Sequence, residues 1–200
     1  GVSKEKIRHV GNIMIESMER FNHLVLEALI LDELGLKEKT YLVATIHRAE
    51  NTDDLRVFEK ILNTLDILSE DHTIVMPLHP GTKAKVKNFG FEEKLKNIQI
   101  VEPLGYLEFM NLVMKSKGVI TDSGGIQEET TYIGVPCATL RDNTERPVTL
   151  ELGTNKLFPI DTLDPKKIEE HINQPCVKTK IPLWDGEVSD RILKVLEEKL

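Results

Sequence analysis

The sequence contains little cysteine and no long apolar run, and each absence excludes a class of protein. Cys137 and Cys176 are the two cysteines among 200 residues. Neither lies in a C-x-x-C motif, so a disulfide framework is excluded and a reducing cytoplasm is the expected compartment. No apolar run reaches the roughly 18 residues of a membrane-spanning helix. The charged start of the chain does not resemble a signal peptide, so secretion is not expected.

Three motifs that mark common enzyme classes are also missing. Without G-x-G-x-x-G or G-x-x-x-x-G-K-[ST], a nicotinamide dehydrogenase and a P-loop NTPase both lose support. The absence of G-x-S-x-G argues against a hydrolase of that type. The formal net charge of −7 disfavours non-specific binding to nucleic acid or to anionic membranes, although it leaves room for a local basic pocket.

The chain instead alternates short apolar runs with helical patterns. Several runs lack polar alternation, which is typical of strands buried on both faces of a parallel sheet. Strands are predicted over 41–46, 73–78, 98–104, 118–122, 136–140 and 156–160. Helices are predicted over about 12–34, after a cap at Thr52, over 106–117, after Asp164 and over 187–200. This alternation predicts an α/β fold with a doubly wound, Rossmann-like parallel sheet.

In such a sheet, ligands bind outside the carboxyl ends of the strands. His47 and His79 each close a predicted strand, so both side chains should face that cleft. A histidine there can donate a proton to a phosphate or leaving-group oxygen near neutral pH, and Arg48 can pair with an anion. The alternative is a loop salt bridge followed by a turn at Asn51. No further ligands stand at recognisable spacing, so a zinc site is not expected.

The stretch TDSGGIQEE, residues 121–129, joins a predicted strand to a predicted helix. A helix start leaves backbone N–H groups unpaired, and two glycines let an anion approach them closely. The Ser123 hydroxyl would add a donor to this phosphate cradle; the alternative is a plain turn with Ser123 as the N-cap. One of Glu128 and Glu129 can accept hydrogen bonds from two ribose hydroxyls, unless both are surface charges that suit the helix dipole.

Two arginines follow the predicted strand 136–140 into the same cleft. The guanidinium groups of Arg141 and Arg146 suit a diphosphate, because they bind it through paired hydrogen bonds. The alternative is that both are solvated and paired with Asp142 and Glu145.

Three stretches, HRAEN, TDSGGIQEE and LRDNTERPVTLELGTN, occur in that order and resemble the non-hydrolysing UDP-N-acetylglucosamine 2-epimerases. The resemblance runs from residue 10 to residue 186 and is to the carboxyl-terminal half of that family. It implies a fold like the second domain of a GT-B-type enzyme, with the nucleotide in the cleft between two domains. The hydrolysing relatives carry a Ser-rich turn, so DSGG favours the non-hydrolysing branch.

The resemblance also implies which residues bind the nucleotide. Ser123, Gly124 and Gly125 match the family's diphosphate-binding turn. Glu129 matches the carboxylate that holds the ribose hydroxyls, and Phe109 matches an aromatic residue that packs near the uracil.

Further residues match the region of the family's site where the sugar reacts. His47 and Arg146 match a catalytic histidine and a cleft arginine, and Arg48 beside His47 is expected to contact the substrate. His79 matches a cleft histidine linked, in bacterial members, to a second sugar-nucleotide site. Gly81 departs from the Asn or Arg common there, which puts that second site in doubt.

The family mechanism eliminates UDP to leave a 2-acetamidoglucal and then adds UDP back, interconverting UDP-GlcNAc and UDP-ManNAc without a cofactor. A helix start and an arginine stabilise the charge that forms on the departing diphosphate. The acid and base that act on C2 belong to the amino-terminal domain, which a chain of this length lacks. We therefore expect a UDP-binding isomerase half without activity of its own.

The expected organisation is one nucleotide-sugar-binding domain over 1–200, with a hinge at 1–12 and a crossing terminal helix at 187–200. For the whole protein, the resemblance implies a cytoplasmic homodimer in polysaccharide biosynthesis, with no nucleic-acid or membrane partner. Two alternatives remain open: the donor-binding domain of a GT-B glycosyltransferase, and a non-catalytic UDP-binding module.

Overall fold

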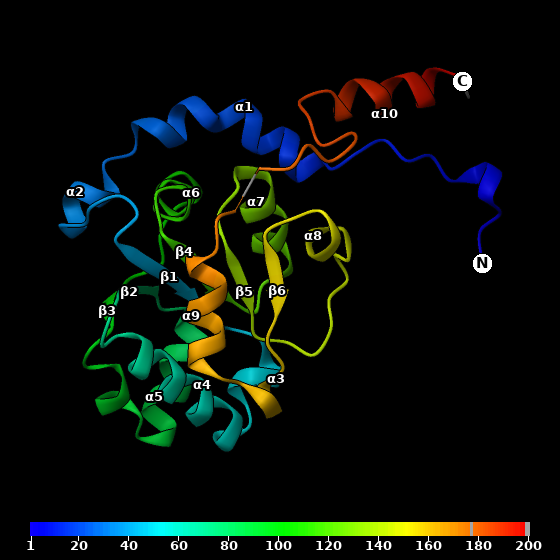
Figure 1. Cartoon of the computed structure of the whole chain (residues 1–200). Helices are drawn as coiled ribbons and strands as arrows, with labels where there is room; N and C mark the ends of the chain where they lie inside the picture. Colours follow the sequence, from blue (N-terminus) through cyan, green and yellow to red (C-terminus); the bar gives the residue numbers. More distant parts are fainter. Residues whose placement is uncertain (177, 199–200) are drawn as a thin grey trace.

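A six-stranded parallel sheet lies between two layers of helices in the computed structural model, which describes residues 1–176 and 178–198 (Figure 1). The strands are β1 (Tyr41–Thr45), β2 (Thr73–Pro77), β3 (Gln99–Val101), β4 (Gly118–Thr121), β5 (Cys137–Thr139) and β6 (Asn155–Leu157). Their order is β3-β2-β1-β4-β5-β6, and each neighbouring pair is parallel. The predicted doubly wound, Rossmann-like α/β fold is confirmed.

Helices cover both faces of the sheet. The α-helices are α1 (Ile13–Glu27), α2 (Ile30–Leu34), α3 (Ala49–Thr52), α4 (Leu55–Leu68), α5 (Pro80–Phe89), α6 (Tyr106–Met114), α7 (Gly124–Ile133), α8 (Val148–Glu151), α9 (Pro165–Asn173) and α10 (Val188–Glu197). Short 3-10 turns span Lys4–Lys6, Glu92–Leu95 and Ile160–Thr162. One core cluster joins α1, α6 and α7 to one sheet face, and a second joins α4 and α9 to the other.

Strand β1 shows why the apolar runs lack polar alternation. Leu42 and Ala44 belong to the cluster under α4, whereas Tyr41 and Val43 belong to the cluster under α1 and α6. All four are fully buried. A strand covered on both faces needs apolar residues at every position.

The predicted helix 12–34 is two helices. Its ends are confirmed, because the Asn12 side chain accepts a hydrogen bond from the Met14 amide and Gly35 closes the second helix with a φ of 66°. Between them, Ala28 adopts an extended conformation. Because of this break, the side chains of Ile30 and Leu31 point into the core cluster that packs on β1.

Three other predicted boundaries are wrong. Asp54, and not Thr52, caps α4, since its carboxylate accepts from the amides of Arg56 and Val57. Helix α6 ends at Met114, because the backbone has joined the sheet by Lys117, whose amide donates to the carbonyl of Tyr41. Strand β3 ends before residue 103, a proline that cannot donate to a strand ladder.

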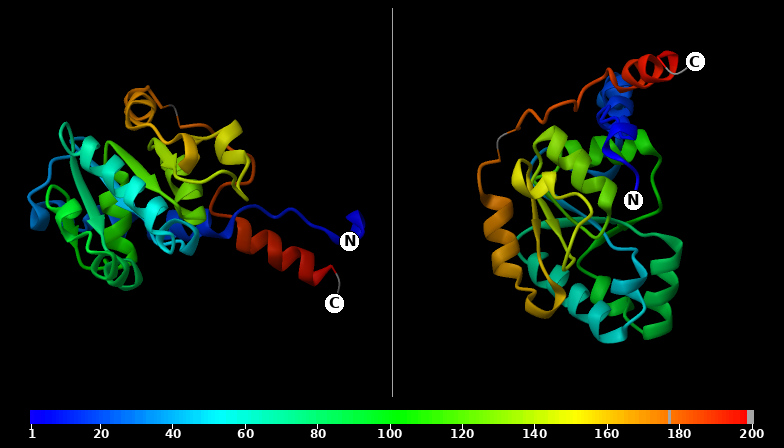
Figure 2. Two further views of the ribbon diagram at one scale, coloured as in Figure 1. Left: turned by 90° about the horizontal axis from the view of Figure 1, so that it is seen from below. Right: turned by 90° about the vertical axis from the view of Figure 1, so that its right-hand side faces the viewer.

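The chain start and α10 extend away from the sheet on the same side of the molecule (Figure 2). The described part of the predicted terminal helix begins at Val188 and ends at Glu197, and residues 199–200 lie outside the described residues. Over residues 1–176 and 178–198, no helix has both the length and the apolar character needed to span a membrane.

Candidate functional site

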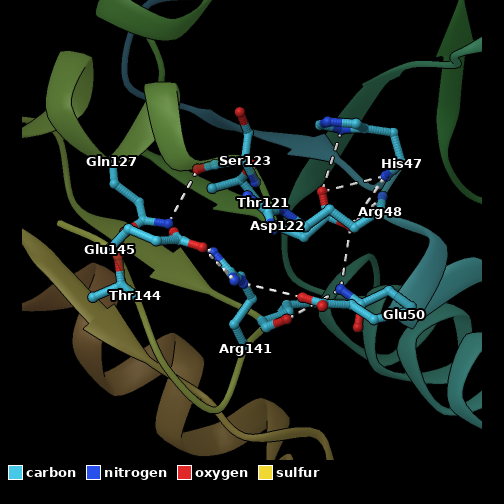
Figure 3. A network of polar contacts seen from close by, with 12 residues as sticks. His47, Arg48, Glu50, Thr121, Asp122, Ser123, Gln127, Arg141, Thr144 and Glu145 are labelled. Atoms are coloured by element: carbon cyan, nitrogen blue, oxygen red, sulfur yellow. Dashed lines mark hydrogen bonds and ion pairs between the residues drawn. The ribbon is translucent and has the colours of Figure 1, made fainter.

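The strand order reverses direction at β1 and β4, and Asp122 links the loops that follow these two strands. Its fully buried carboxylate accepts hydrogen bonds from the backbone amides of His47 (3.1 Å) and Arg48 (2.9 Å) and from Asn51 Nδ2 (3.2 Å). His47 Nδ1 lies 3.2 Å from the other carboxylate oxygen (Figure 3). Asp122 therefore fixes the loop that carries His47 against the end of β4.

A cavity of about 400 Å³ opens at this point, outside the carboxyl ends of the strands. Four of the predicted site residues line it: His47, His79, Phe109 and Ser123. The two histidine rings have their centroids 6.2 Å apart. His79 also caps α5, since its Nδ1 accepts from the Gly81 amide at 3.1 Å. In the described residues, no group of three or more His, Cys, Asp or Glu side chains is arranged to hold a metal ion.

The turn before α7 has the geometry of an anion site. Ser123 precedes the helix in an extended conformation, and its side chain does not cap a helix amide. A Cβ placed on Gly124 would make only ordinary van der Waals contacts, with Arg48 Nη2 at 3.8 Å and Glu145 Oε2 at 4.0 Å as its nearest neighbours. The alternative of Ser123 as a side-chain N-cap is not what the structure has. The unpaired amides of the helix start face a space that a guanidinium group borders.

Glu129 is buried on α7, and none of the described residues forms an ion pair with it. The pKa of Glu129 is raised to about 7, mainly by burial; a hydrogen bond from Tyr106 opposes this increase, and the negative charge of Glu128 adds to it. Burial and Glu129 together raise the pKa of Tyr106 to about 12. Because the pKa of Glu129 exceeds its ordinary value of 4.5, the folded chain loses stability as the pH rises from about 4.5 through about 7. Added hydroxyl donors would favour the ionised carboxylate.

Glu128, by contrast, has a partner at each carboxylate oxygen. Its Oε1 accepts from Asn12 Nδ2 at 2.9 Å, and its Oε2 lies 3.0 Å from Arg146 Nε. That second contact is an ion pair without the alignment of a hydrogen bond, so within residues 1–176 and 178–198 Arg146 Nε makes no hydrogen bond. Arg146 lines a neighbouring cavity of about 500 Å³ with Trp184. The structure therefore does not place Arg146 in the cavity of the two histidines.

The Arg141 side chain forms ion pairs and does not face an open cleft. Its Nε lies 3.1 Å from Glu50, and its two terminal nitrogens donate to Glu145 at 2.9 and 3.0 Å. These bonds lower the pKa of Glu145 to about 2. Pairing with Glu145 was the alternative that the sequence offered, but the second partner is Glu50 and not Asp142.

Sequence reasoning missed Asp122 and Asn51 as parts of the site. Asn51 is buried and bridges Asp122 to the carbonyl of Leu140 at 3.1 Å, so it is more than a turn residue. The available signal was an aspartate at the end of a central strand, directly before the Ser–Gly–Gly turn.

Comparisons with a family model and with curated proteins match the chain to the same family. The sequence model of the UDP-N-acetylglucosamine 2-epimerase family matches residues 1–197. Curated UDP-N-acetylglucosamine 2-epimerases of Methanococcus maripaludis and Methanocaldococcus jannaschii are 40% identical over 172 residues and 35% identical over 210 residues. The alignments cover 80% and 98% of this chain but 46% and 56% of the relatives. The chain thus spans about half the length of the curated relatives it matches.

A solved structure agrees in fold over nearly the whole chain. The crystal structure of M. jannaschii UDP-GlcNAc 2-epimerase in complex with UDP-GlcNAc and UDP has a TM-score of 0.86 and 35% identity to this chain. The match covers 99% of this chain and 56% of that one.

Proposed function

The chain belongs to the UDP-N-acetylglucosamine 2-epimerase family, and we propose that it is the nucleotide-binding half of such an enzyme. The observation that carries the proposal is the cavity at the reversal point of the sheet, which His47 and Ser123 line from the loops after β1 and β4 and Phe109 lines from helix α6. Ligands of doubly wound sheets bind at this place.

The proposed ligand is a UDP-sugar whose parts meet different chemistry. The diphosphate lies against the amides of Gly124 and Gly125 and the Ser123 hydroxyl, where the helix start favours negative charge. Glu129 accepts hydrogen bonds from the ribose hydroxyls, which suits a buried carboxylate that forms no ion pair among the described residues. Phe109 packs near the uracil ring. Glu128 does not take the ribose role, because Asn12 and Arg146 already occupy it.

The remaining assignments concern the departing diphosphate. Arg48 Nη2 lies 3.8 Å from the position of a Cβ on Gly124, and Arg146 Nε is ion-paired to Glu128 but makes no hydrogen bond among the described residues, so both are proposed to contact the developing charge. His47 is proposed as the proton donor to that leaving group, held in place by Asp122. His79, across the cavity, is proposed to contact the substrate.

For the whole protein, the proposal is an isomerase that interconverts UDP-GlcNAc and UDP-ManNAc. The acid and base at C2 are assigned to a half that this chain does not contain, in keeping with its coverage of about half of each relative. Residues 1–12 would form the hinge to that half, and the helix that begins at Val188 would cross back to it. A cytoplasmic homodimer in polysaccharide biosynthesis follows from the resemblance alone.

The direct test is a calorimetric titration of the chain with UDP and, as the control, with ADP. We expect UDP to bind at least about tenfold more tightly, a difference of about 1.4 kcal/mol. Incubation of the chain alone with UDP-GlcNAc should give no UDP-ManNAc, because the groups that move the C2 proton are absent. Equal affinity for the two nucleotides would contradict the proposed site, and measurable conversion would contradict the proposed division of the enzyme.

The raised pKa of Glu129 predicts a pH dependence of binding. If ribose hydroxyls bind the ionised carboxylate and the pKa of the free group is about 7, binding releases a proton. About one Glu129 side chain in ten is then ionised at pH 6 and about nine in ten at pH 8. The affinity for the ligand should therefore rise about tenfold over that interval. UDP-GlcNAc is the suitable ligand, since the terminal phosphate of UDP itself titrates near pH 6.

The matched control for this measurement is Glu129→Gln. The variant should bind UDP-GlcNAc more weakly and with an affinity that stays nearly constant from pH 6 to pH 8. A variant that keeps the full pH dependence would assign that dependence to a group other than Glu129.

A further inference from the structure

Gln127 is fully buried in α7 and makes three hydrogen bonds. Its Nε2 donates to the carbonyl of Ser123 at 3.2 Å. Its Oε1 accepts from Thr144 Oγ1 at 2.6 Å and from Asn155 Nδ2 at 3.0 Å. Since the Ser123 carbonyl can only accept, the bond to it fixes which end of the carboxamide faces the turn. Figure 3 shows the side chain reaching from the turn toward Thr144.

The same network continues to both backbone groups of Arg146. The Arg146 amide donates to Thr144 Oγ1 at 3.0 Å. Its carbonyl accepts from Thr149 Oγ1 at 2.7 Å, and that hydroxyl accepts from Asn155 Nδ2 at 3.0 Å. Each hydroxyl therefore donates once and accepts once, and both paths from Arg146 end on the carboxamide oxygen of Gln127.

Ion pairs also hold the loop that carries Arg146, and one of them places Arg146 Nε 3.0 Å from Glu128 Oε2 of α7. Arg141 anchors its beginning through Glu50 and Glu145, whereas Asp142 and Glu145 are exposed. The Ser123 turn belongs to a different unit, the junction of β4 and α7. Gln127 is the side chain that hydrogen-bonds to the turn on one side and, through Thr144, to the arginine loop on the other.

We propose that Gln127 is a positioning residue that sets the spacing between the Ser123 turn and Arg146. This inference rests on the proposed function, in which the turn and the arginine contact the same diphosphate. Recognition by two groups on separate elements requires both to be held in place before the ligand arrives, and shifts of about 1 Å are costly. The base and ribose contacts, at Phe109 and Glu129, are outside this network.

The proposal predicts a loss of affinity confined to ligands that carry phosphates. Thr144→Val keeps the side-chain shape but removes the hydroxyl that joins Gln127 to Arg146. We expect it to weaken UDP binding about tenfold while uridine binding stays within about twofold. A displaced Arg146 would lose its hydrogen bond to the charged diphosphate, and such a bond is worth about that much. Titrations followed by ¹H–¹⁵N NMR measure both, since they reach millimolar affinities.

Two further variants complete the experiment. Thr144→Ser retains the hydroxyl and should restore binding of UDP. Thr64→Val makes the same change at a buried threonine of α4 whose hydroxyl bonds only within its own helix, to Lys60 at 2.9 Å, and should leave both affinities unchanged. Gln127→Met, which removes all three bonds, should lower UDP affinity at least as much as Thr144→Val.

The outcomes distinguish the positioning role of Gln127 from the proposed function on which it rests. If the unaltered chain fails to bind UDP, the proposed function is wrong. If it binds UDP and Thr144→Val binds UDP equally well, the proposed function stands and the positioning role is wrong. Equal losses for UDP and uridine, with a lower melting temperature, would mean that the network merely stabilises the fold and would also overturn the positioning role.

Discussion

Replacing Asp122 by alanine is expected to lower the free energy of unfolding by about 3 kcal/mol. The carboxylate is fully buried and accepts from the amides of His47 and Arg48 and from the buried side chain of Asn51. Hydrogen bonds to a charged group contribute about 1.5–3 kcal/mol each. Water can replace the carboxylate at the partly exposed amides of His47 and Arg48, so the expected loss is about that of the one bond from buried Asn51. Urea denaturation at pH 7 measures the change.

Asp54→Ala is the matched control for that prediction. Asp54 is an exposed N-cap whose carboxylate also accepts backbone amides, at 2.8 and 3.1 Å, so the same atoms and the same charge are removed. Loss of such a cap costs about 1 kcal/mol. If the Asp122 variant is no less stable than the Asp54 variant, the buried carboxylate does not fix the His47 loop as the structure indicates.

The strands were predictable because their signal is local. A run such as residues 41–44 is apolar at every position, and both sheet faces are covered, so sequence and structure agree without knowledge of the partners. The helix break at Ala28 had no such signal, since neither glycine nor proline marks it. It follows from the fit of Ile30 and Leu31 into a core that distant segments build.

The same distinction applies to the site. Topology alone brings His47, His79 and Ser123 to one cavity, because parallel strands all end at one edge of the sheet. Sequence could not decide between Glu128 and Glu129, which are adjacent on one helix. The structure shows that their partners differ: Glu128 accepts from Asn12, 116 positions away, and no local pattern reports such a contact.

Replacing Gly124 by alanine is expected to leave the fold intact and to weaken UDP binding by about ten- to a hundredfold, or about 1.4–2.8 kcal/mol. The added methyl group would meet nothing closer than 3.8 Å in the protein, and Gly124 does not have a positive φ. Alanine is the better helix former, so the melting temperature should stay the same or rise slightly. The methyl group would instead fill the space in which a phosphate oxygen must approach the helix amides.

Ser123→Ala separates this steric effect from loss of one donor. It removes a hydroxyl that does not cap α7 and adds no bulk, so the loss of UDP affinity should be smaller than for Gly124→Ala. Uridine, which has no phosphate, should bind both variants as it binds the unaltered chain. A Gly124→Ala chain that melts normally and binds UDP normally would show that no anion approaches these amides. The diphosphate would then have to lie elsewhere, and the roles proposed for Arg48 and Arg146 would fall with it, because both depend on an anion at this turn.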